Sequence, residues 1–317
     1  MKILANDGIS QSGIDVLKKS GFEVITTKVA QEQLANFINT EHIDVVLVRS
    51  ATTVRKDVID SCPNLKIIGR GGVGMDNIDV DYARSKGLHV INTPAASSSS
   101  VAELVFAHLF GGVRYLHDAN RNMPLDGDSQ FKNLKKAYAS GKELRGKTLG
   151  IIGFGRIGQA TAKIALGVGM KVIAFDPFIE SAIINLDFFD GQTLDFKIDT
   201  ISKEDVLKCS DFITLHVPAQ KDYVIGKTEF DLMKDDVGIV NAARGGVIDE
   251  VALIDALENN KLSFAALDTF ENEPTPAIKV LMNQKVSLTP HIGAATKEAQ
   301  NRIGTELASQ IIELLVK

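Results

Sequence analysis

The sequence of 317 residues has no tryptophan, only two cysteines, and no apolar run near the roughly 18 residues that cross a membrane. Cys62 and Cys209 lie far apart and lack metal-ligand spacing, so we predict reduced thiols and no metal. The amino terminus reaches Asp7 too early for the apolar segment of a signal peptide. These absences predict a soluble, cytoplasmic protein with no membrane partner.

A large excess of one charge sign is also missing. The net charge is -5, with 24% charged and 44% hydrophobic residues, which are ordinary values for a globular protein. Such a balance gives no general attraction to nucleic acid or to an anionic membrane. We therefore predict no nucleic-acid partner, and any phosphate on a ligand must be held by a local basic site. The length is too great for one compact core and predicts about two domains.

Short apolar strands alternate with helical stretches through most of the chain, which predicts parallel sheets with helices on both faces. The alternation breaks near Pro94 and again near Pro290, before a final amphipathic helix. We predict an α/β fold with two doubly wound parallel-sheet domains and a cleft between them. Residues 1–97 and 291–317 would form one domain, and residues 98–290 the other.

Three stretches do not fit this alternation. A helix predicted over Val101–Tyr115 is apolar around most of its surface, so it is buried in its own domain or against a second subunit. The polar segment 123–147 is weakly periodic and is predicted to be an irregular arm. The segment 187–200 gives no clear pattern.

A glycine-rich turn is the strongest motif of the chain. Gly153-Phe-Gly155-Arg-Ile-Gly158 follows an apolar strand and opens a helix at Arg156. Only glycine lets the backbone turn so tightly and approach a pyrophosphate, whose charge the helix N-terminus stabilises. The next strand ends at Asp176, close to the expected spacing of a ribose-binding carboxylate, and no arginine follows for a 2′-phosphate. The motif predicts a Rossmann-like domain that binds NAD.

Three further residues follow predicted strands of the same domain, where ligands bind in open parallel sheets. Arg244 precedes two glycines and can face a carboxylate with its guanidinium. His291 carries the side chain best suited to proton transfer near neutral pH, and Glu273 could orient its ring. Glu271 lies so near that spacing alone does not choose between the two glutamates. The plainer alternatives are a surface arginine and a structural histidine.

A second glycine loop lies in the first domain, after its fourth predicted strand. Its amides, at Gly72, Val73 and Gly74, could bind a carboxylate as an anion nest. Arg49 and Arg70 could supply positive charge for a phosphate. The alternative is a tight structural turn beside solvated arginines.

In combination, Arg-Gly-Gly at Arg244, Glu-Pro at Glu273 and Pro-His-Ile-Gly-Ala at His291 resemble the D-isomer-specific 2-hydroxyacid dehydrogenases. The resemblance covers essentially the whole chain. It implies that Arg244 binds the substrate carboxylate and carbonyl, and that Glu273 and His291 handle the proton. It implies a homodimer through Val101–Tyr115. The contacts with NAD that it implies are Val73, Arg156, Ile157, Asp176, Val217, Ala242 and Asp268.

Within this family, Arg49, the loop Gly69–Asn77 and the stretch after His291 are most like members that act on a phosphorylated hydroxy acid. That likeness implies that Arg49 and Arg70 meet the phosphate of D-3-phosphoglycerate, which is oxidised to 3-phosphohydroxypyruvate in the first step of serine biosynthesis. Since the sequence ends at Lys317, we expect the extra carboxyl-terminal domains of many such enzymes, and serine feedback through them, to be absent.

Two other functions remain open from the sequence. The first is a reductase for glyoxylate, hydroxypyruvate or another 2-oxo acid, which would share the arginine, glutamate and histidine but differ at the anion site of the first domain. The second belongs to another class, a dinucleotide-sensing corepressor-like protein that binds NAD without turnover.

Overall fold

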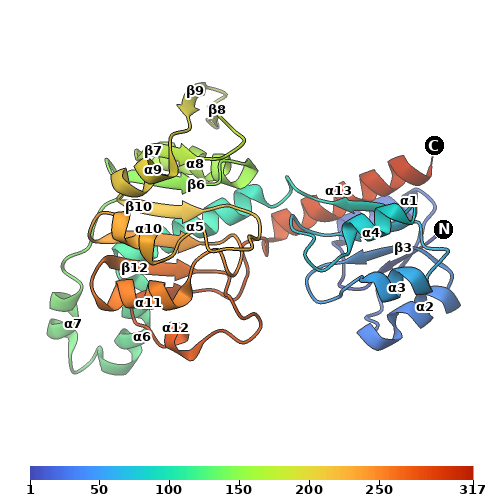
Figure 1. Cartoon of the computed structure of the whole chain (residues 1–317), viewed down its shortest axis with the longest axis horizontal. Helices are drawn as coiled ribbons and strands as arrows, with labels where there is room; N and C mark the ends of the chain where they lie inside the picture. The colour runs from blue at the N-terminus through green and yellow to red at the C-terminus, as the bar shows by residue number, and fades with distance from the viewer. Residues whose placement is uncertain (317) are drawn as a thin grey trace. The chain divides into compact units, whose positions relative to one another are not determined.

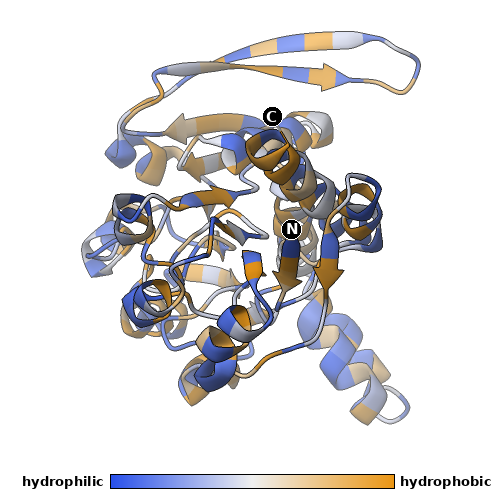
Figure 2. Cartoon of the chain, turned by 90° about the vertical axis from the view of Figure 1, so that its right-hand side faces the viewer, coloured by the Kyte–Doolittle hydropathy of each residue, from blue (hydrophilic) through white to orange (hydrophobic). Residues whose placement is uncertain are grey.

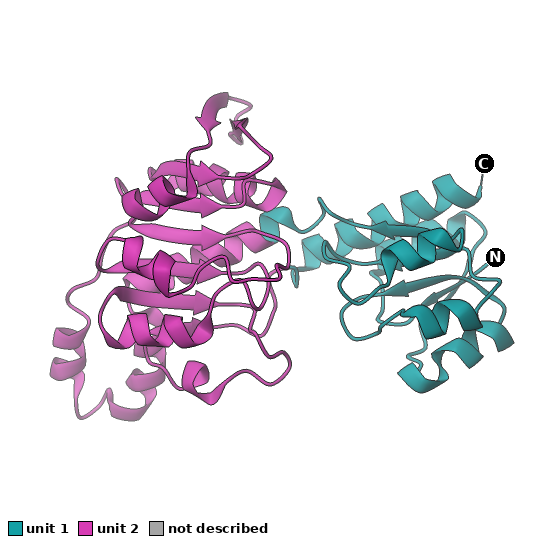
Figure 3. Ribbon diagram, in the orientation of Figure 1, with its two compact units in different colours: residues 1–100, 294–317 teal, residues 101–293 magenta. Residues whose placement is uncertain are grey.

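The computed structural model describes residues 1–316, and the chain divides into two compact units (Figure 3). Unit 1 contains Met1–Ser100 and the segment from Ala294 onward, and unit 2 contains residues 101–293. The chain therefore passes between units after Ser100 and after Gly293, three residues beyond each of the predicted boundaries. Lys317, the last residue of the predicted first domain, lies outside the described residues.

Unit 1 is built on a five-stranded sheet of order β2-β1-β3-β4-β5, with every pair parallel. Alternate strand residues point to opposite faces, because side chains in a strand have a period of two. Val46 and Ile68 pack on one face with α2, α3 and α4, while Leu47 and Ile67 pack on the other with α1 and α13. The elements of unit 1 are β1 (Lys2–Ala5), α1 (Gln11–Lys19), β2 (Glu23–Ile25), η1 (Gln31–Gln33), α2 (Leu34–Thr40), β3 (Ile43–Val48), α3 (Lys56–Ser61), β4 (Ile67–Arg70), α4 (Val80–Ser85), β5 (His89–Asn92) and α13 (Lys297–Leu315).

Unit 2 is built on a six-stranded parallel sheet of order β13-β12-β11-β10-β6-β7 (Figure 1). Helices α5 and α8 cover one face of this sheet, and α9, α10 and α11 cover the other. The prediction of two doubly wound parallel sheets is confirmed. The elements of unit 2 are α5 (Ser98–Val113, whose first residues belong to unit 1), α6 (Leu116–Asp126), α7 (Phe131–Ala137), β6 (Thr148–Ile152), α8 (Arg156–Val168), β7 (Lys171–Phe175), β8 (Ser181–Asp187), β9 (Thr193–Asp199), α9 (Lys203–Cys209), β10 (Phe212–Leu215), α10 (Lys227–Leu232), β11 (Val237–Asn241), α11 (Glu250–Glu258), β12 (Leu262–Leu267), α12 (Ile278–Leu281) and β13 (Val286–Leu288).

The segment 187–200, which gave no clear pattern, forms the tip and the second strand of an antiparallel hairpin of β8 and β9 beside the β7 edge of unit 2. Ile184 and Ile198 are buried on one side of the hairpin, whereas Ile183 is 67% exposed and Phe189 fully exposed. Figure 2 shows hydrophobic and hydrophilic residues alternating along both strands. Because only the part near α8 is covered, the apolar residues of this stretch do not mark one buried face.

The predicted irregular arm 123–147 is wrong over its first half. Helix α6 extends to Asp126 and α7 spans Phe131–Ala137, as the lower left of Figure 1 shows. Neither helix buries a side chain, and α6 contains Pro124. A helix without a buried face has no amphipathic signature in its sequence, which is why the pattern failed here.

Among residues 1–316, no helix is long and apolar enough to cross a membrane. Cys62 is buried in unit 1, Cys209 is exposed in unit 2, and both are free thiols.

Candidate active site

The glycine turn joins the end of β6 to the start of α8. Gly153 has φ +94°, and a Cβ there would lie 2.6 Å from the His216 carbonyl oxygen. A Cβ on Gly158 would overlap the Gly153 carbonyl oxygen, so the helix packs directly on the turn. At Gly155, by contrast, a Cβ would meet nothing within 4 Å, and no side chain caps α8. The first amides of α8 are therefore open to an anion, as a pyrophosphate requires.

Asp176 lies directly after β7, beside the glycine turn. Its Oδ2 accepts a hydrogen bond from the Phe154 amide at 2.7 Å, and its Oδ1 accepts from the amides of Phe178 at 2.9 Å and Ile179 at 3.2 Å. A carboxylate has about four acceptor positions, so these three bonds fix the group and leave capacity for a ribose hydroxyl. The turn thus fits the pyrophosphate of an adenosine diphosphate moiety, and the acid fits its ribose.

The remaining predicted cofactor positions of unit 2 lie at the same edge of its sheet. Val217, Ala242 and Asp268 come within two residues of the carboxyl ends of β10, β11 and β12. Arg156 and Ile157 form the first turn of α8. All of these lie where ligands of open parallel sheets bind. Val73 belongs to unit 1, in the loop after β4.

Glu273 and His291 are in contact. His291 Nδ1 lies 2.8 Å from Glu273 Oε2, and the two side chains are 46% and 37% exposed. The other carboxylate oxygen of Glu273 accepts from the Phe270 amide at 3.0 Å, which fixes its orientation. His291 itself has φ +54°, an uncommon conformation for a residue other than glycine.

The second glutamate of this loop has a different set of contacts. Glu271 Oε1 accepts from the Glu250 amide at 2.9 Å, and Glu250 Oε1 accepts from the Glu271 amide at 2.8 Å. Burial and the nearby Glu271 carboxylate raise the pKa of Glu250. This reciprocal pair joins α11 to the loop after β12. The geometry therefore separates the two glutamates that spacing could not: Glu273 contacts the histidine and Glu271 contacts the protein scaffold.

Two other histidines of unit 2 are poor candidates for proton transfer. Burial lowers the pKa of His216 to about 3, and the ring contacts the hydroxyls of Thr161 and Thr214. Burial also lowers the pKa of His108. Burial thus disfavours the charged form of both rings, whereas His291 is exposed and paired with a carboxylate.

Arg244 lies in the loop after β11, and that loop packs on the loop of Glu273. Asn241 fixes the turn, since its Nδ2 donates to the Arg244 carbonyl at 2.9 Å and its Oδ1 accepts from the Ala243 amide at 3.0 Å. A Cβ on Gly245 would overlap the carbonyl oxygen of Phe270. The Arg-Gly-Gly motif thus brings the arginine loop against the segment that orients Glu273.

Asp268 is hydrogen-bonded to the segment around His291, from Thr289 to Gly293. It is 1% exposed, and its Oδ1 accepts from the Thr289 hydroxyl at 2.7 Å and the Ile292 amide at 2.8 Å. Its Oδ2 accepts from the Gly293 amide at 2.9 Å. The carboxylate therefore fixes the chain on both sides of His291. Sequence reasoning missed this role of Asp268 and the role of Asn241; the available signal was a polar residue at the carboxyl end of an apolar strand.

Arg49 and Arg70 lie at the carboxyl ends of adjacent strands in unit 1. Val48 pairs with Arg70 in the sheet, and Arg70 Nε donates to Asn77 Oδ1 at 3.1 Å. Asn77 Nδ2 in turn donates to the Arg49 carbonyl at 2.7 Å, so one amide side chain organises both loops. Gly72, at φ +152°, leaves room for the Arg70 guanidinium, with which a Cβ would collide. The loop continues through Val73 and Gly74.

Asp7, at the end of β1, supports the Arg49 loop by accepting from the Arg49 amide at 2.7 Å. Burial alone would raise the pKa of Asp7, but hydrogen bonds from Lys28, Thr52 and the Arg49 amide outweigh it and lower that pKa. Asp7 therefore stays ionised as a fixed acceptor. Neither Asp7 nor Asn77 was a sequence candidate, because most of their partners are remote in the chain: Asp7 accepts from the amides of Arg49 and Thr52, 42 and 45 residues away, and Asn77 donates to the carbonyls of Arg49 and Thr52, 28 and 25 residues away.

Residues 106–293 match the family model described as D-isomer specific 2-hydroxyacid dehydrogenase, NAD binding domain. The match covers more than half of the chain and includes the glycine turn, Asp176, Arg244, Glu273 and His291. The chain belongs to the D-isomer specific 2-hydroxyacid dehydrogenases.

Two relatives align over 99% of this dehydrogenase. It is 43% identical to a hydroxypyruvate reductase of Thermotoga maritima, over 98% of that protein. It is 42% identical to a D-3-phosphoglycerate dehydrogenase of Methanocaldococcus jannaschii, of which it spans only 57%. Its fold matches the NAD+-bound 3-phosphoglycerate dehydrogenase of Entamoeba histolytica with a TM-score of 0.78 and 28% identity, over 100% of this chain and 96% of that one. The chain is an NAD-dependent oxidoreductase.

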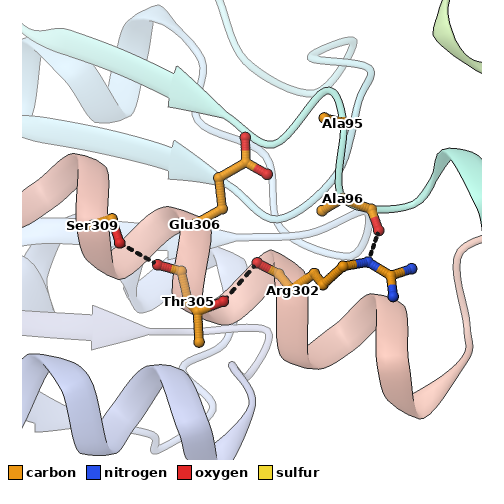
Figure 4. A pocket seen from close by; sticks show the side chains of 6 residues that line it. All are labelled: Ala95, Ala96, Arg302, Thr305, Glu306 and Ser309. Atoms are coloured by element: carbon orange, nitrogen blue, oxygen red, sulfur yellow. Dashed lines mark hydrogen bonds between the residues drawn. The ribbon is translucent and has the colours of Figure 1, made fainter. Parts of the chain in front are cut away.

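A hollow of unit 1 lies apart from the predicted site residues of this dehydrogenase (Figure 4). Helix α13 forms one side of it, and Arg302 Nε donates to the Ala96 carbonyl at 2.8 Å across it. The lining residues are Ala95, Ala96, Arg302, Thr305, Glu306 and Ser309. Within the described part of the chain, no three histidine, cysteine or acidic residues are grouped to hold a metal ion.

Proposed function

We propose that this dehydrogenase oxidises D-3-phosphoglycerate to 3-phosphohydroxypyruvate, the first step of serine biosynthesis. The observation that carries the proposal is the pair of arginines at the carboxyl ends of β3 and β4, joined by Asn77 in unit 1. Two guanidinium groups at one sheet edge suit a phosphate dianion, which no unphosphorylated 2-hydroxy acid offers. Unit 1 is then the substrate-binding domain, and the glycine turn of unit 2 holds the dinucleotide.

The chemistry of the site follows from atom assignments on the Glu273–His291 pair. An ionised Glu273 only accepts hydrogen bonds, so neutral His291 carries its proton on Nδ1 and presents the Nε2 lone pair. Nε2 then takes the proton of the substrate hydroxyl. NAD, when bound at the glycine turn, would supply the acceptor for the hydride on the carbon that bears this hydroxyl. Arg244 holds the substrate carboxylate, and Glu273 stabilises the imidazolium that forms. In the reverse direction the imidazolium returns the proton to the carbonyl oxygen.

Replacing both Arg49 and Arg70 with glutamine tests the phosphate assignment. Each charge-assisted contact is worth about 1.5–3 kcal/mol, so kcat/KM for phosphohydroxypyruvate should fall at least about 100-fold. The rate with glyoxylate should change less than about threefold, because that substrate has no phosphate. The measurement is NADH oxidation with a panel of 2-oxo acids. Arg55→Gln, which removes the exposed ion pair with Asp79 in the same unit, is the matched control.

A second candidate is a reductase for hydroxypyruvate, glyoxylate or another 2-oxo acid. The relative that supports it is the hydroxypyruvate reductase that aligns over nearly the full length of both proteins. It shares the proton-transfer pair and differs in the anion site of unit 1. This second function would replace the first in either of two cases. One is a double arginine variant that keeps its activity on phosphohydroxypyruvate, and the other is a parent enzyme whose kcat/KM is highest for glyoxylate. Membership in a dehydrogenase family argues against a corepressor that binds NAD without turnover.

We also propose a homodimer through α5. Most apolar side chains of this helix are buried within unit 2, including Val105 and Leu109, so its hydrophobicity does not by itself indicate a partner. Within unit 2, the exposed residues along this helix are more informative: they are Glu103, Ala107 and Phe110, and the exposed Arg114 follows directly after the last helical residue, Val113. Two such helices in antiparallel contact would place each acid opposite a base and each alanine opposite a phenylalanine. Such self-complementarity is what a two-fold interface needs.

Charge reversal at α5 tests the dimer. Glu103→Arg or Arg114→Glu alone should place like charges together and weaken association at least about tenfold. The double variant should restore much of the affinity, because the pairing is recreated with the signs exchanged. Sedimentation equilibrium measures the association. A monomeric parent protein, or no recovery in the double variant, would contradict the antiparallel arrangement.

A further inference from the structure

His108 lies within a chain of hydrogen bonds that starts at Ser287 and ends at the His291 segment. It is 4% exposed on the sheet-facing side of α5. Its Nδ1 lies 2.9 Å from the Ser287 hydroxyl, and its Nε2 lies 3.0 Å from the Thr289 hydroxyl. Thr289 contacts Asp268, the carboxylate that fixes the amides on the far side of His291.

Counting protons fixes the direction of every bond in this chain. The Asp268 carboxylate only accepts, so the single hydroxyl proton of Thr289 is donated to it. Thr289 must therefore accept from His108, whose proton lies on Nε2. In a singly protonated ring Nδ1 then accepts from the Ser287 hydroxyl, and burial, which lowers the pKa of His108, favours that form. The order of donation is Ser287 to His108 to Thr289 to Asp268, and no proton is left over.

The chain ends on the segment that carries the proposed base. Asp268 Oδ1 is shared between the Thr289 hydroxyl and the Ile292 amide, and Oδ2 holds the Gly293 amide. Thr289 also donates its own amide to the Leu267 carbonyl at 3.0 Å. His291 lies between these anchors with φ +54°, and a left-handed conformation at a residue other than glycine persists where the surrounding structure holds it. Aligned hydrogen bonds in a dry interior strengthen one another, so the anchor is stiffer with His108 than without it.

We propose that His108 is a positioning residue for the dehydrogenase reaction, acting through Thr289 and Asp268 on His291. The proposal rests on the proposed role of His291 in proton transfer. His108 touches no reacting atom; it fixes the loop whose position sets the distance from His291 Nε2 to the substrate.

His108→Phe is the variant to test, because it fills the space and removes both hydrogen bonds. Displacing a catalytic group by about 1 Å costs up to about 100-fold in rate, so kcat should fall about 10- to 100-fold. The Kd for NADH should stay within about twofold. Thr289→Val should act similarly, whereas Thr289→Ser keeps the hydroxyl and should retain most activity. His117→Phe, which removes a hydrogen bond from α6 to the Gln284 carbonyl, is the matched control and should leave kcat unchanged.

A double-mutant cycle separates positioning from general destabilisation. If His108 acts through His291, then His108→Phe should have no further effect on kcat in a His291→Gln background. A full additional loss in that background would overturn the proposal. Should His108→Phe fail to fold, Ser287→Ala removes only the donor to Nδ1 and should lower kcat about three- to tenfold, and an unchanged kcat would overturn the proposal.

Hydrogen exchange provides a readout that needs no turnover. His108→Phe should raise exchange at the Ile292 and Gly293 amides at least about tenfold, while amides in β6 keep their protection. Unchanged exchange at both amides would overturn the positioning role even if the enzyme is active. Raised exchange in a protein that turns over no 2-oxo acid would instead support the anchor and reject the proposed reaction. The two failures are therefore distinguishable.

Discussion

His291→Gln should lower kcat by about 100- to 10,000-fold, the usual contribution of a positioned acid or base. Glutamine can still accept a hydrogen bond from a substrate hydroxyl, but it cannot take up the proton as hydride leaves. NADH affinity should remain within about threefold, because the glycine turn and Asp176 are distant in sequence and form their own contacts. Steady-state rates and NADH fluorescence titration are the measurements.

Two further variants show whether the loss of kcat is specific to proton transfer by His291. His89→Gln changes an exposed histidine of unit 1 and should have no effect on turnover. Glu273→Gln keeps the imidazole but loses the charge that stabilises its protonated form, so its loss should be smaller than that of His291→Gln. A His291→Gln enzyme within tenfold of the parent rate would mean that another group transfers the proton.

Gly245→Ala should damage the enzyme more than any other single methyl group added to the site. The new Cβ would overlap the Phe270 carbonyl oxygen, and both partners are backbone, so no side chain can move aside. The Arg244 loop and the Glu273 loop must then separate. Overpacking costs about 1–3 kcal/mol in stability, and a shift of about 1 Å between the two loops costs about 100-fold in kcat. Thermal unfolding and steady-state kinetics measure the two effects.

The neighbouring glycine supplies the control for this experiment. Gly246 has φ +75°, but a Cβ there would meet nothing within 4 Å. Gly246→Ala should therefore cost about 1–2 kcal/mol of backbone strain and leave kcat within a few-fold. Equal rate losses in the two variants would show that backbone conformation, and not the close approach to Phe270, governs the position of Arg244.

The parts of the fold that sequence predicts are those encoded locally. The glycine turn, the strand before it and the acid of Asp176 follow one another within 30 residues, and each residue type is dictated by its own backbone or ligand contact. Arg244, Glu273 and His291 could be selected because the loops that follow parallel strands gather at one sheet edge. The structure shows the contact of Glu273 with His291, and the catalytic role of the pair stays a proposal.

The missed residues depend on neighbours that are remote in the chain. His108 lies 179 residues from Ser287, and Asn77 lies 28 residues from Arg49. On a largely apolar helix, a histidine has no local feature that indicates a hydrogen-bonded chain. Helices α6 and α7 were missed for a different reason. They bury no side chain, so their sequences show no periodic hydrophobic pattern.

The β8–β9 hairpin also makes this scaffold open to engineering. Its tip is closed by its own backbone bonds, with the Phe188 amide donating to the Gln192 carbonyl at 2.8 Å. The returning chain then caps the free edge of β7, where the Ile201 amide donates to the Ala174 carbonyl at 2.8 Å. A peptide or fluorescent reporter could therefore be inserted after Gly191, at the tip of a hairpin that forms its own hydrogen bonds. The edge of β7 would stay covered against pairing with other chains.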